Sequence, residues 1–368
     1  MTKAYHFGQL LSAPAPAPAP APASRSPPFL PGPGCGHSRP AACQTAQVRT
    51  ESSRVVVATG YGGPEVLSLL EEPTPVPGAQ EVLVQVRAAG VNPADYKSVR
   101  GDFGADPARL PLRVGSEAAG VVLDVGEEAF GPAGPIAIGD EVIAFRAPGA
   151  YATALVVPAS AVVPKPQALP WEQAGGLMLA GVTAVHALRA VGLAAGETVL
   201  VHGAAGGVGH LAVQLAAGLG ATVVGTASAA KHELLRELGA IPVAYGPGLV
   251  DRVRAAAPAG VAAAVAVDAV GSDEAVGASL ELVADKARIA TIAAYERGKK
   301  TGIKILGGFP GADRGTEIRE AARLELVEAA GAGKLRVLVA ATYRLEDAAE
   351  ALREVMAGHV TGKVVLLP

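Results

Sequence analysis

The sequence predicts an α/β protein built from two different parts, a small barrel-like β domain and a doubly wound parallel sheet. Short Val-rich stretches bounded by glycine or proline recur before residue 176 and are typical of strands. From about residue 177, strands and helices alternate with short connections, which indicates a parallel sheet covered on both faces. The composition, with 46 glycines and only 4% aromatic residues, suits layers packed through small side chains.

Residues 1–53 differ from the rest of the chain. Residues 13–23 alternate strictly between alanine and proline, and ten of the 29 prolines lie in the first 40 residues. Such a segment lacks backbone donors for a ladder, so we expect a disordered extension, which serves as a tether or precedes the true start of the folded enzyme. Both cysteines, Cys35 and Cys43, lie here beside His37, and we interpret them as chance thiols in an unstructured segment.

The individual elements follow from these patterns. In the β part, strands are expected at 54–58, 81–89, 118–125, 141–145 and 153–157. In the parallel part, strands are expected at 198–202, 222–226, 242–245, 261–267 and 287–293, and helices at 208–219, 230–238, 249–257 and 272–283. A helix at 346–357 precedes a strand at 363–367, which could return to the first sheet.

Charge and hydropathy exclude some classes of partner. The net charge is −3 and no run of Lys or Arg occurs, so we expect no nucleic-acid partner. Residues 198–230 contain no charged side chain and imitate a membrane span, but glycines interrupt the stretch and its period changes midway. A buried strand, helix and strand explain it better, so we expect a cytoplasmic protein with no membrane contact.

A glycine-rich turn is the most informative passage. The strand at 198–202 leads into Gly203-Ala204-Ala205-Gly206-Gly207-Val208-Gly209, and a helix follows directly. Without side chains at Gly206 and Gly207, backbone N–H groups can approach a pyrophosphate, and Gly209 lets helix and strand pack closely. The strand before the turn and the β-α series after it support a dinucleotide site. The predicted contacts are Ala205, Gly206, Gly207, Val208 and Gly209.

The end of the second strand of the parallel sheet indicates which dinucleotide binds. NAD would call for an acidic residue about 20 residues past the glycines, but residues 225–231 contain none. A 2′-phosphate needs hydroxyl donors and a cation, which Thr226, Ser228 and Lys231 supply. Tyr245, at the end of the third strand, could add a hydroxyl beside the adenine. The sequence therefore predicts NADPH, while His202 is interpreted as a strand residue rather than a catalytic one.

Six motifs occur in a fixed order along residues 54–368: GYGGPEVL at 60–67, AAGVNPADYK at 88–97, GSEAAG at 115–120, GDEV at 139–142, GAAGGVG at 203–209 and GHVTGKVVL at 358–366. Together they resemble the zinc-independent quinone oxidoreductases (the zeta-crystallin-like group) of the medium-chain dehydrogenase/reductase superfamily. The resemblance implies a GroES-like substrate domain at 54–176 plus 299–368, with a Rossmann NADP-binding domain at 177–298 inserted in it. It also implies an active site in the cleft between them and a homodimer formed through edge strands.

The chain departs from the zinc-dependent members of that superfamily. Those carry a cysteine near position 92, a histidine at 116 and a further ligand near 180, whereas this chain has Asn92, Ser116 and Ala180 and no cysteine after residue 43. Zinc needs three or four nitrogen, sulfur or carboxylate ligands in a tetrahedral array. We therefore expect no catalytic zinc.

Without zinc, the remaining chemistry is hydride transfer from NADPH, with donors stabilising the negative charge that develops on the acceptor oxygen. The resemblance implies that the loop at 92–97 faces the nicotinamide. Our hypothesis is that Asn92 fixes the carboxamide or the substrate, while Tyr96 or Lys97 donates to the oxyanion or supplies the proton. The choice between Tyr96 and Lys97 stays open.

Three further positions complete the predicted cofactor site. Thr183, in the segment LAGVTA, resembles the family's contact to the nicotinamide ribose. Asp268 and Val270 end the fourth strand, where cofactor-side loops collect at the carboxyl edge of a parallel sheet. Residues 299–318 are expected to line the cleft.

The expected function is NADPH-dependent reduction of a small-molecule quinone or α,β-unsaturated carbonyl without a metal. One alternative is a stand-alone reductase of enoyl thioesters, because related reductases act there. The other is an NADPH-binding protein with little catalysis, because a fold does not guarantee activity. A screen of acceptors with NADPH against NADH separates these readings.

Overall fold

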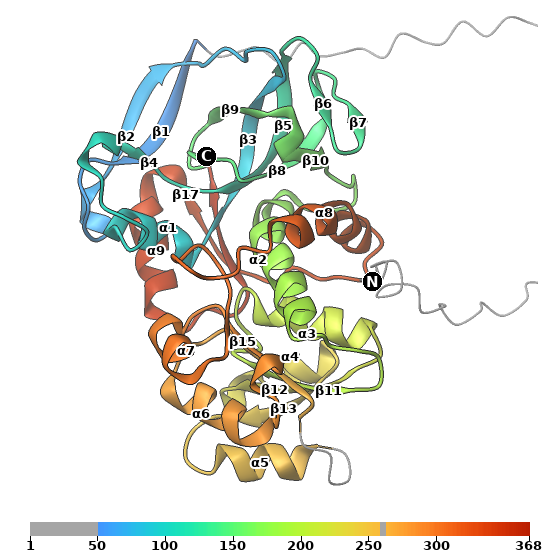
Figure 1. Ribbon diagram of the computed structural model, residues 1–368. Helices are drawn as coiled ribbons and strands as arrows, with labels where there is room; N and C mark the ends of the chain where they lie inside the picture. The colour runs from blue at the N-terminus through green and yellow to red at the C-terminus, as the bar shows by residue number, and fades with distance from the viewer. Residues whose placement is uncertain (1–50, 258–262) are drawn as a thin grey trace, which may run out of the picture.

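The computed structural model describes residues 51–257 and 263–368 (Figure 1). Most of the predicted extension, residues 1–50 with both cysteines, lies outside the described residues. Ser52 already belongs to the first strand, so the folded part begins slightly before residue 54.

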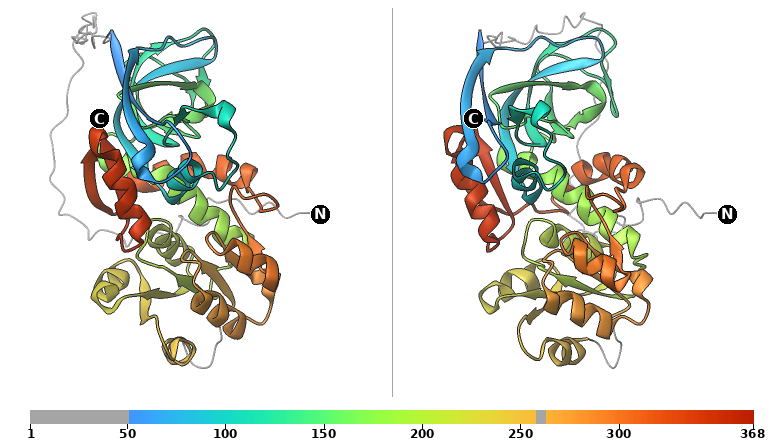
Figure 2. Two further views of the ribbon diagram at one scale, coloured as in Figure 1. Left: turned by 90° about the vertical axis from the view of Figure 1, so that its left-hand side faces the viewer. Right: turned by 60° about the vertical axis from the view of Figure 1, so that its left-hand side comes forward.

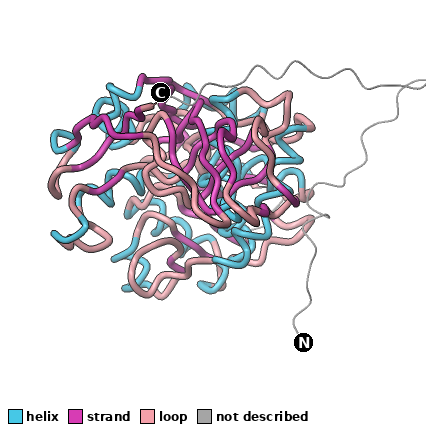
Figure 3. The backbone as a smooth tube through the Cα atoms, turned by 90° about the horizontal axis from the view of Figure 1, so that it is seen from above, coloured by secondary structure: helices cyan, strands magenta, loops and turns pink. Residues whose placement is uncertain are grey.

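The first part of the molecule is a β domain. Its strands are β1 (Ser52–Ala58), β2 (Leu67–Pro73), β3 (Glu81–Val91), β4 (Leu112–Arg113), β5 (Glu117–Val125), β6 (Phe130–Gly131), β7 (Gly134–Pro135), β8 (Glu141–Phe145), β9 (Ala154–Pro158), β10 (Val162–Pro164), β17 (Val339–Arg344) and β18 (Lys363–Leu367). The main sheet has the order β10-β8-β5-β3-β18-β17, with β9 also paired to β3. These strands lie side by side in the view from above (Figure 3).

The C-terminal strand returns to this first sheet, as the sequence suggested. β18 pairs antiparallel with β3, and β17 pairs parallel with β18. Strands that precede and follow the parallel domain in the sequence therefore share one sheet, and the parallel domain is inserted between them. This arrangement confirms the predicted fold class, a GroES-like β domain with an inserted doubly wound Rossmann domain.

The inserted domain contains six parallel strands in the order β13-β12-β11-β14-β15-β16. They are β11 (Thr198–His202), β12 (Thr222–Ala227), β13 (Ala240–Ala244), β14 (Val265–Asp268), β15 (Ile289–Thr291) and β16 (Lys304–Ile305). The chain reverses direction across the sheet between β11 and β14, which is where open α/β sheets bind ligands. The strand expected at 261–267 begins at Val265, and residues 258–262 lie outside the described part.

The helices are α1 (Pro93–Arg100), α2 (Trp171–Ala190), α3 (Gly209–Gly218), α4 (His232–Glu237), α5 (Leu249–Ala256), α6 (Asp273–Leu282), α7 (Tyr295–Thr301), α8 (Thr316–Gly331) and α9 (Ala348–Ala357). The segment that imitated a membrane span is β11, α3 and β12, as expected. No helix within the described ranges is long and apolar enough to cross a membrane.

Helix α2 was missed by the sequence analysis, which placed the change of pattern inside it. Figures 1 and 2 show α2 running between the β domain and the parallel sheet. It is buried on nearly every side, so it lacks the polar face that makes a helix recognisable from its pattern. A Cβ added at Gly175 would lie 2.8 Å from the backbone oxygen of Ala88, so a glycine there lets α2 approach β3 closely. One hydrophobic cluster therefore joins residues of α2, β8, β11 and α3.

Candidate active site

The dinucleotide turn has the predicted geometry. β11 ends at His202, Gly203 has φ +70°, and α3 begins at Gly209. A Cβ at Gly209 would lie 2.1 Å from the Gly203 oxygen, so no other residue fits without moving the turn. A Cβ added at Gly206 would lie 3.3 Å from the Gly203 oxygen and one at Gly207 would lie 3.4 Å from Lys363 Cδ, both tight contacts, so the turn has little room for side chains. The turn thus fits a pyrophosphate at the start of a helix.

A buried histidine that the sequence analysis missed holds this turn. His210 Nδ1 donates to the Gly206 oxygen at 2.8 Å, and Nε2 accepts the N–H of Leu338 at 3.1 Å. Burial lowers the pKa of His210 to about 4, so the ring is neutral and keeps both roles at pH 7. Its only sequence signal was a polar residue at an otherwise apolar position in the first turn of α3.

The predicted 2′-phosphate residues do not all lie together. Thr226 is buried, and its hydroxyl accepts the Gly203 N–H at 3.3 Å, so it braces the turn from inside the sheet. Ser228 and Lys231 follow β12 and are partly accessible, and Lys231 Nζ donates to the His359 oxygen at 3.0 Å. Tyr245 follows β13 and is 58% exposed. Of these residues, Thr226 is thus unavailable to a ligand at the surface, whereas Ser228 and Lys231 are partly accessible.

His202 lies inside the sheet, in line with its interpretation as a strand residue. Its ring contacts the hydroxyls of Thr226 and Ser279 at 3.3 and 3.1 Å, and burial lowers its pKa to about 4.

The loop after β14 lies beside the turn. Asp268 is fully buried and accepts the N–H groups of Val270 and Gly271, both at 2.9 Å, so its carboxylate shapes this loop. Val270 is 52% exposed, and one of its methyl groups would lie 2.6 Å from a Cβ at Gly203. Val270 thus lies against the turn with an exposed face, whereas Asp268 is a supporting residue.

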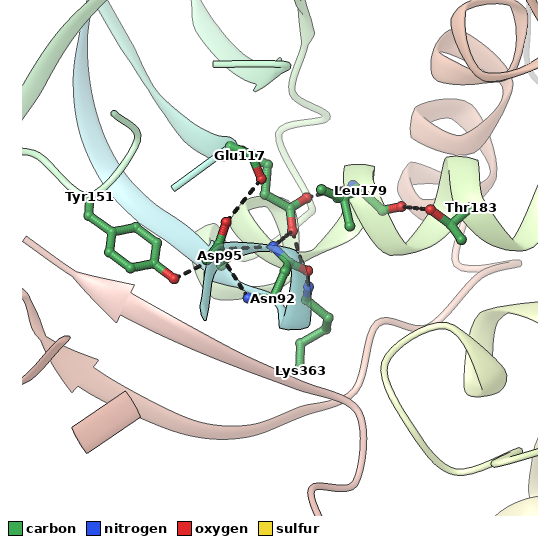
Figure 4. A network of polar contacts seen from close by, with 9 residues as sticks. Asn92, Asp95, Glu117, Tyr151, Leu179, Thr183 and Lys363 are labelled. Atoms are coloured by element: carbon green, nitrogen blue, oxygen red, sulfur yellow. Dashed lines mark hydrogen bonds and ion pairs between the residues drawn. The ribbon is translucent and has the colours of Figure 1, made fainter. Parts of the chain in front are cut away.

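A buried polar network lies at the junction of the domains (Figure 4). Asn92 is 2% exposed; its Nδ2 donates to Glu117 Oε1 at 2.9 Å and to the Gly90 oxygen at 3.2 Å. Its Oδ1 accepts from Lys363 Nζ. Both polar atoms of the Asn92 amide have protein partners, which hold the side chain in place.

Asp95 forms a second arm of the network. Its carboxylate accepts the Asn92 N–H and the Tyr151 hydroxyl, each at 2.8 Å, and the Ser116 hydroxyl at 3.4 Å. Burial is the main cause that raises the pKa of Asp95 to about 6. The capping bond to the Asn92 N–H also fixes where α1 begins.

Thr183 lies on α2 close to the same network. Its hydroxyl donates to the Leu179 oxygen at 2.7 Å, and the Leu179 N–H donates to Glu117 Oε2, also at 2.7 Å. The structure therefore connects Asn92 and Thr183, two predicted site residues, through the carboxylate of Glu117.

The two candidate proton donors occupy different surroundings. Tyr96 packs against the hydrophobic core of the β domain, with the Arg100 guanidinium 5.6 Å from its ring centre. Lys97 Nζ lies 5.4 Å from the ring centre of Phe309, which contacts Phe103 and Tyr295. Partial burial lowers the pKa of Lys97 from its ordinary value.

The donors at the positions of the superfamily's zinc ligands do not fit a zinc ion. Asn92 offers an amide that is already bonded, Ser116 a hydroxyl directed to Asp95, and Ala180 a methyl group. The Lys363 ammonium lies 3.1 Å from the nearby carboxylate of Glu117, so a cation already pairs with it. We derive no step through a metal.

Comparison with known proteins agrees with the fold. Residues 78–167 match the family described as Alcohol dehydrogenase GroES-like domain, and residues 238–366 match the family described as Zinc-binding dehydrogenase. A quinone oxidoreductase of Pseudomonas aeruginosa is 34% identical over 330 residues, which span 84% of this chain and 97% of that protein. The chain therefore belongs to the medium-chain dehydrogenase/reductase superfamily, a family of oxidoreductases, among its quinone oxidoreductase-like members.

Two further similarities are informative. A mycobacterial protein solved in complex with NADPH superposes with a TM-score of 0.74 at 31% identity, covering 86% of this chain and all of that one. The mouse synaptic vesicle membrane protein VAT-1 homolog is 38% identical over 214 residues, or 56% of this chain. The chain spans about half the length of such VAT-1 homologues, 52% in the mouse protein.

Proposed function

We propose that the protein is an NADPH-dependent reductase of quinones or α,β-unsaturated carbonyls that works without a metal. The observation that carries the proposal is the position of the glycine turn. Gly362 N–H bonds to the Ala205 oxygen at 2.8 Å, and the next residue, Lys363, reaches Asn92 and Glu117. A dinucleotide on the turn is thereby adjacent to the buried polar network. The solved NADPH complex of a relative supports the same cofactor.

The roles of the chain's own residues follow from their positions. The turn at Gly206 and Gly207 binds the pyrophosphate, and Ser228 and Lys231 bind the 2′-phosphate. Bound NADPH supplies the hydride. Lys97 donates a hydrogen bond, and then a proton, to the acceptor oxygen as negative charge develops there. The buried polar network holds Asn92 and the turn of α2 that carries Thr183 in place.

The assignment of the proton-donor role to Lys97 rather than Tyr96 can be tested by substitution. Lys97→Met is expected to lower kcat about tenfold or more, while Tyr96→Phe has little effect, because general-acid catalysis contributes at least that much. Lys299 provides a matched control, because its ammonium lies 5.3 Å from the ring centre of Tyr295 in the same aromatic group. Equal losses in Lys97→Met and Lys299→Met would reject the role of Lys97.

The protonated lysine is the active form, so kcat should fall as pH rises through the pKa of Lys97. Because burial lowers that pKa from its ordinary value, the fall should begin earlier than for an exposed lysine. In Lys97→Met this alkaline limb should disappear. A limb that persists unchanged assigns the proton to another group.

The function itself is tested with purified protein, NADPH or NADH, and a panel of quinones, enones and a crotonyl thioester, following absorbance at 340 nm. Turnover of quinones or enones with NADPH supports the proposal. Turnover of the thioester alone supports an enoyl-thioester reductase. Tight NADPH binding without any turnover supports an NADPH-binding protein and rejects the assignment as an enzyme.

A further inference from the structure

Lys363 is a buried cation to which the proposed chemistry assigns no role. It begins β18 and is 3% exposed. Its ammonium donates to Asn92 Oδ1 and lies 3.1 Å from Glu117 Oε1, while Glu117 is fully buried. Burying two charges is costly unless they are paired and hydrogen-bonded. A role in the cofactor site would explain why the chain retains this buried ion pair.

The partners of Glu117 connect the ammonium to helix α2. One carboxylate oxygen, Oε1, accepts hydrogen bonds from Lys363 Nζ and Asn92 Nδ2. The other, Oε2, accepts one from the Leu179 N–H. The carbonyl of the same Leu179 accepts the Thr183 hydroxyl. A continuous chain of polar contacts therefore runs from Lys363 to Thr183 (Figure 4).

The stem of Lys363 extends to the other side of the cofactor site. A Cβ at Gly207 would lie 3.4 Å from Lys363 Cδ, and a Cβ at Gly176 on α2 would lie 3.2 Å from Lys363 Cβ. The preceding residue, Gly362, bonds to Ala205 in the turn. The Cβ of Lys363 thus lies close to α2, its Cδ lies beside Gly207 of the dinucleotide turn, and its ammonium contacts Asn92 and Glu117.

We propose that Lys363 is a positioning residue for the nicotinamide end of the cofactor. Its ammonium holds Glu117 and Asn92 in place, and Glu117 in turn fixes the turn of α2 that carries Thr183. The inference rests on the proposed function for its catalytic consequence, whereas its structural consequence concerns cofactor binding alone. Lys363 contacts no substrate in this scheme and transfers no proton.

Removal of one charge should differ from removal of both. Lys363→Met keeps the length of the stem but leaves the Glu117 carboxylate buried and unpaired, which is strongly unfavourable. The carboxylate is then expected to move toward other donors and disturb Asn92 and Leu179. Adding Glu117→Gln removes the second charge: the Gln oxygen can accept the Leu179 N–H, and its NH₂ group can donate to the Asn92 oxygen, which Lys363 no longer occupies, once the Asn92 amide turns over. The double variant should therefore recover.

The first experiment is calorimetric and needs no turnover. Binding of NADPH is compared with binding of 2′,5′-ADP, which carries the phosphate but no nicotinamide. In Lys363→Met the Kd for NADPH should rise about tenfold, as expected for one lost charged contact, while the Kd for 2′,5′-ADP stays within about twofold. In Lys363→Met with Glu117→Gln the NADPH value should return to within about threefold of wild type.

The kinetic experiment uses the same variants with the best acceptor. Lys363→Met should lower kcat about tenfold at saturating NADPH, with recovery in the double variant. The matched control is Lys165→Met. Lys165 is also a buried lysine, paired with Glu141 at 2.8 Å, and its ammonium lies 4.4 Å from the ring centre of Trp171. Lys165→Met should lower Tm and leave both Kd values and kcat within about twofold of wild type.

The outcomes separate the two proposals. A wild-type protein that reduces no acceptor rejects the proposed function, while the ratio of the two Kd values still tests Lys363. Equal weakening of NADPH and 2′,5′-ADP in folded Lys363→Met overturns the inference, since it indicates general damage. Wild-type values in Lys363→Met, or a double variant no better than the single one, also overturn it.

Discussion

Single polar residues in this protein divide into those that face the cofactor site and those that support it from below. Ser228, Lys231 and Lys97 remain at least partly accessible, whereas Thr226 and Asp268 are buried and accept hydrogen bonds from backbone N–H groups of neighbouring loops. Supporting residues act by fixing backbone positions, because a buried polar group needs partners and thereby orders them.

Lys231 tests the preference for NADPH. Lys231→Ala should weaken NADPH binding about tenfold or more, because one charge-assisted bond to phosphate is lost, and should change NADH binding little. Arg236→Ala is the matched control, since Arg236 lies on the next helix and pairs with Glu233 at the surface. Equal losses for the two cofactors in Lys231→Ala would remove the 2′-phosphate assignment. Calorimetry measures both.

His210 makes the fold sensitive to acid. Its pKa is about 4 in the folded chain against an ordinary 6.5, so between these values the unfolded chain binds a proton that the folded chain does not. Stability therefore falls as pH falls through this window. At pH 5 the loss from His210 is about 2 kcal/mol, and His210→Gln should remove that part of the slope. Urea unfolding at pH 7.5 and pH 5 measures it.

Two other buried groups titrate in the same pH range and also contribute to the pH dependence of stability. His202 acts in the same direction as His210, whereas Asp95, with a pKa raised to about 6, takes up a proton earlier when folded and opposes the loss. Both are present in every variant compared. A His210→Gln variant with an unchanged slope contradicts the assignment.

At the scale of elements, the site depends on close approaches of backbone. The turn between β11 and α3 needs Gly209, and the packing of α2 on β3 needs Gly175. Phe309 contacts Phe103, which lies just after α1, and Tyr295 of α7, so segments distant in the sequence meet in one aromatic group. The close backbone approaches at Gly209 and Gly175 explain why these glycines cannot be exchanged freely for larger residues.

Gly209→Ala should disrupt the cofactor turn. Its Cβ would lie 2.1 Å from the Gly203 oxygen, so the turn must shift and NADPH binding should fall about tenfold or more. Gly277→Ala on α6 is the control, since no atom lies within 4 Å of its Cβ. That variant should bind NADPH normally and gain up to about 1 kcal/mol of stability. Wild-type affinity in Gly209→Ala contradicts the turn assignment.

At the scale of the whole molecule, the parallel sheet ends in two edge strands. β16 and β13 have a pairing partner on one side only within the described chain, and such edges invite pairing with another chain. We predict a homodimer through these edges. Light scattering on the purified full chain at micromolar concentration should give twice the mass of one chain, and a value of one chain contradicts the prediction.

The sequence alone predicted the two-part fold, because alternation of strands and helices, glycine positions and motif order are local features. β8, β11 and β18 have the expected bounds, and the C-terminal strand joins the first sheet as suggested. α2 was missed because a helix buried on all sides has no periodic contrast between polar and apolar faces. Its position could be learned only from what surrounds it.

The sequence determined which chemical groups are present. They are the glycine turn, residues other than zinc ligands at 92, 116 and 180, and a lysine shortly after the end of β12. Only the tertiary structure decided how those groups are used. It turned Thr226 inward, bonded every polar atom of the Asn92 amide within the protein and brought Lys363 to Glu117 across 246 residues of sequence. Hydrogen bonds and ion pairs depend on distances of a few ångströms, which the order of residues along a chain does not contain.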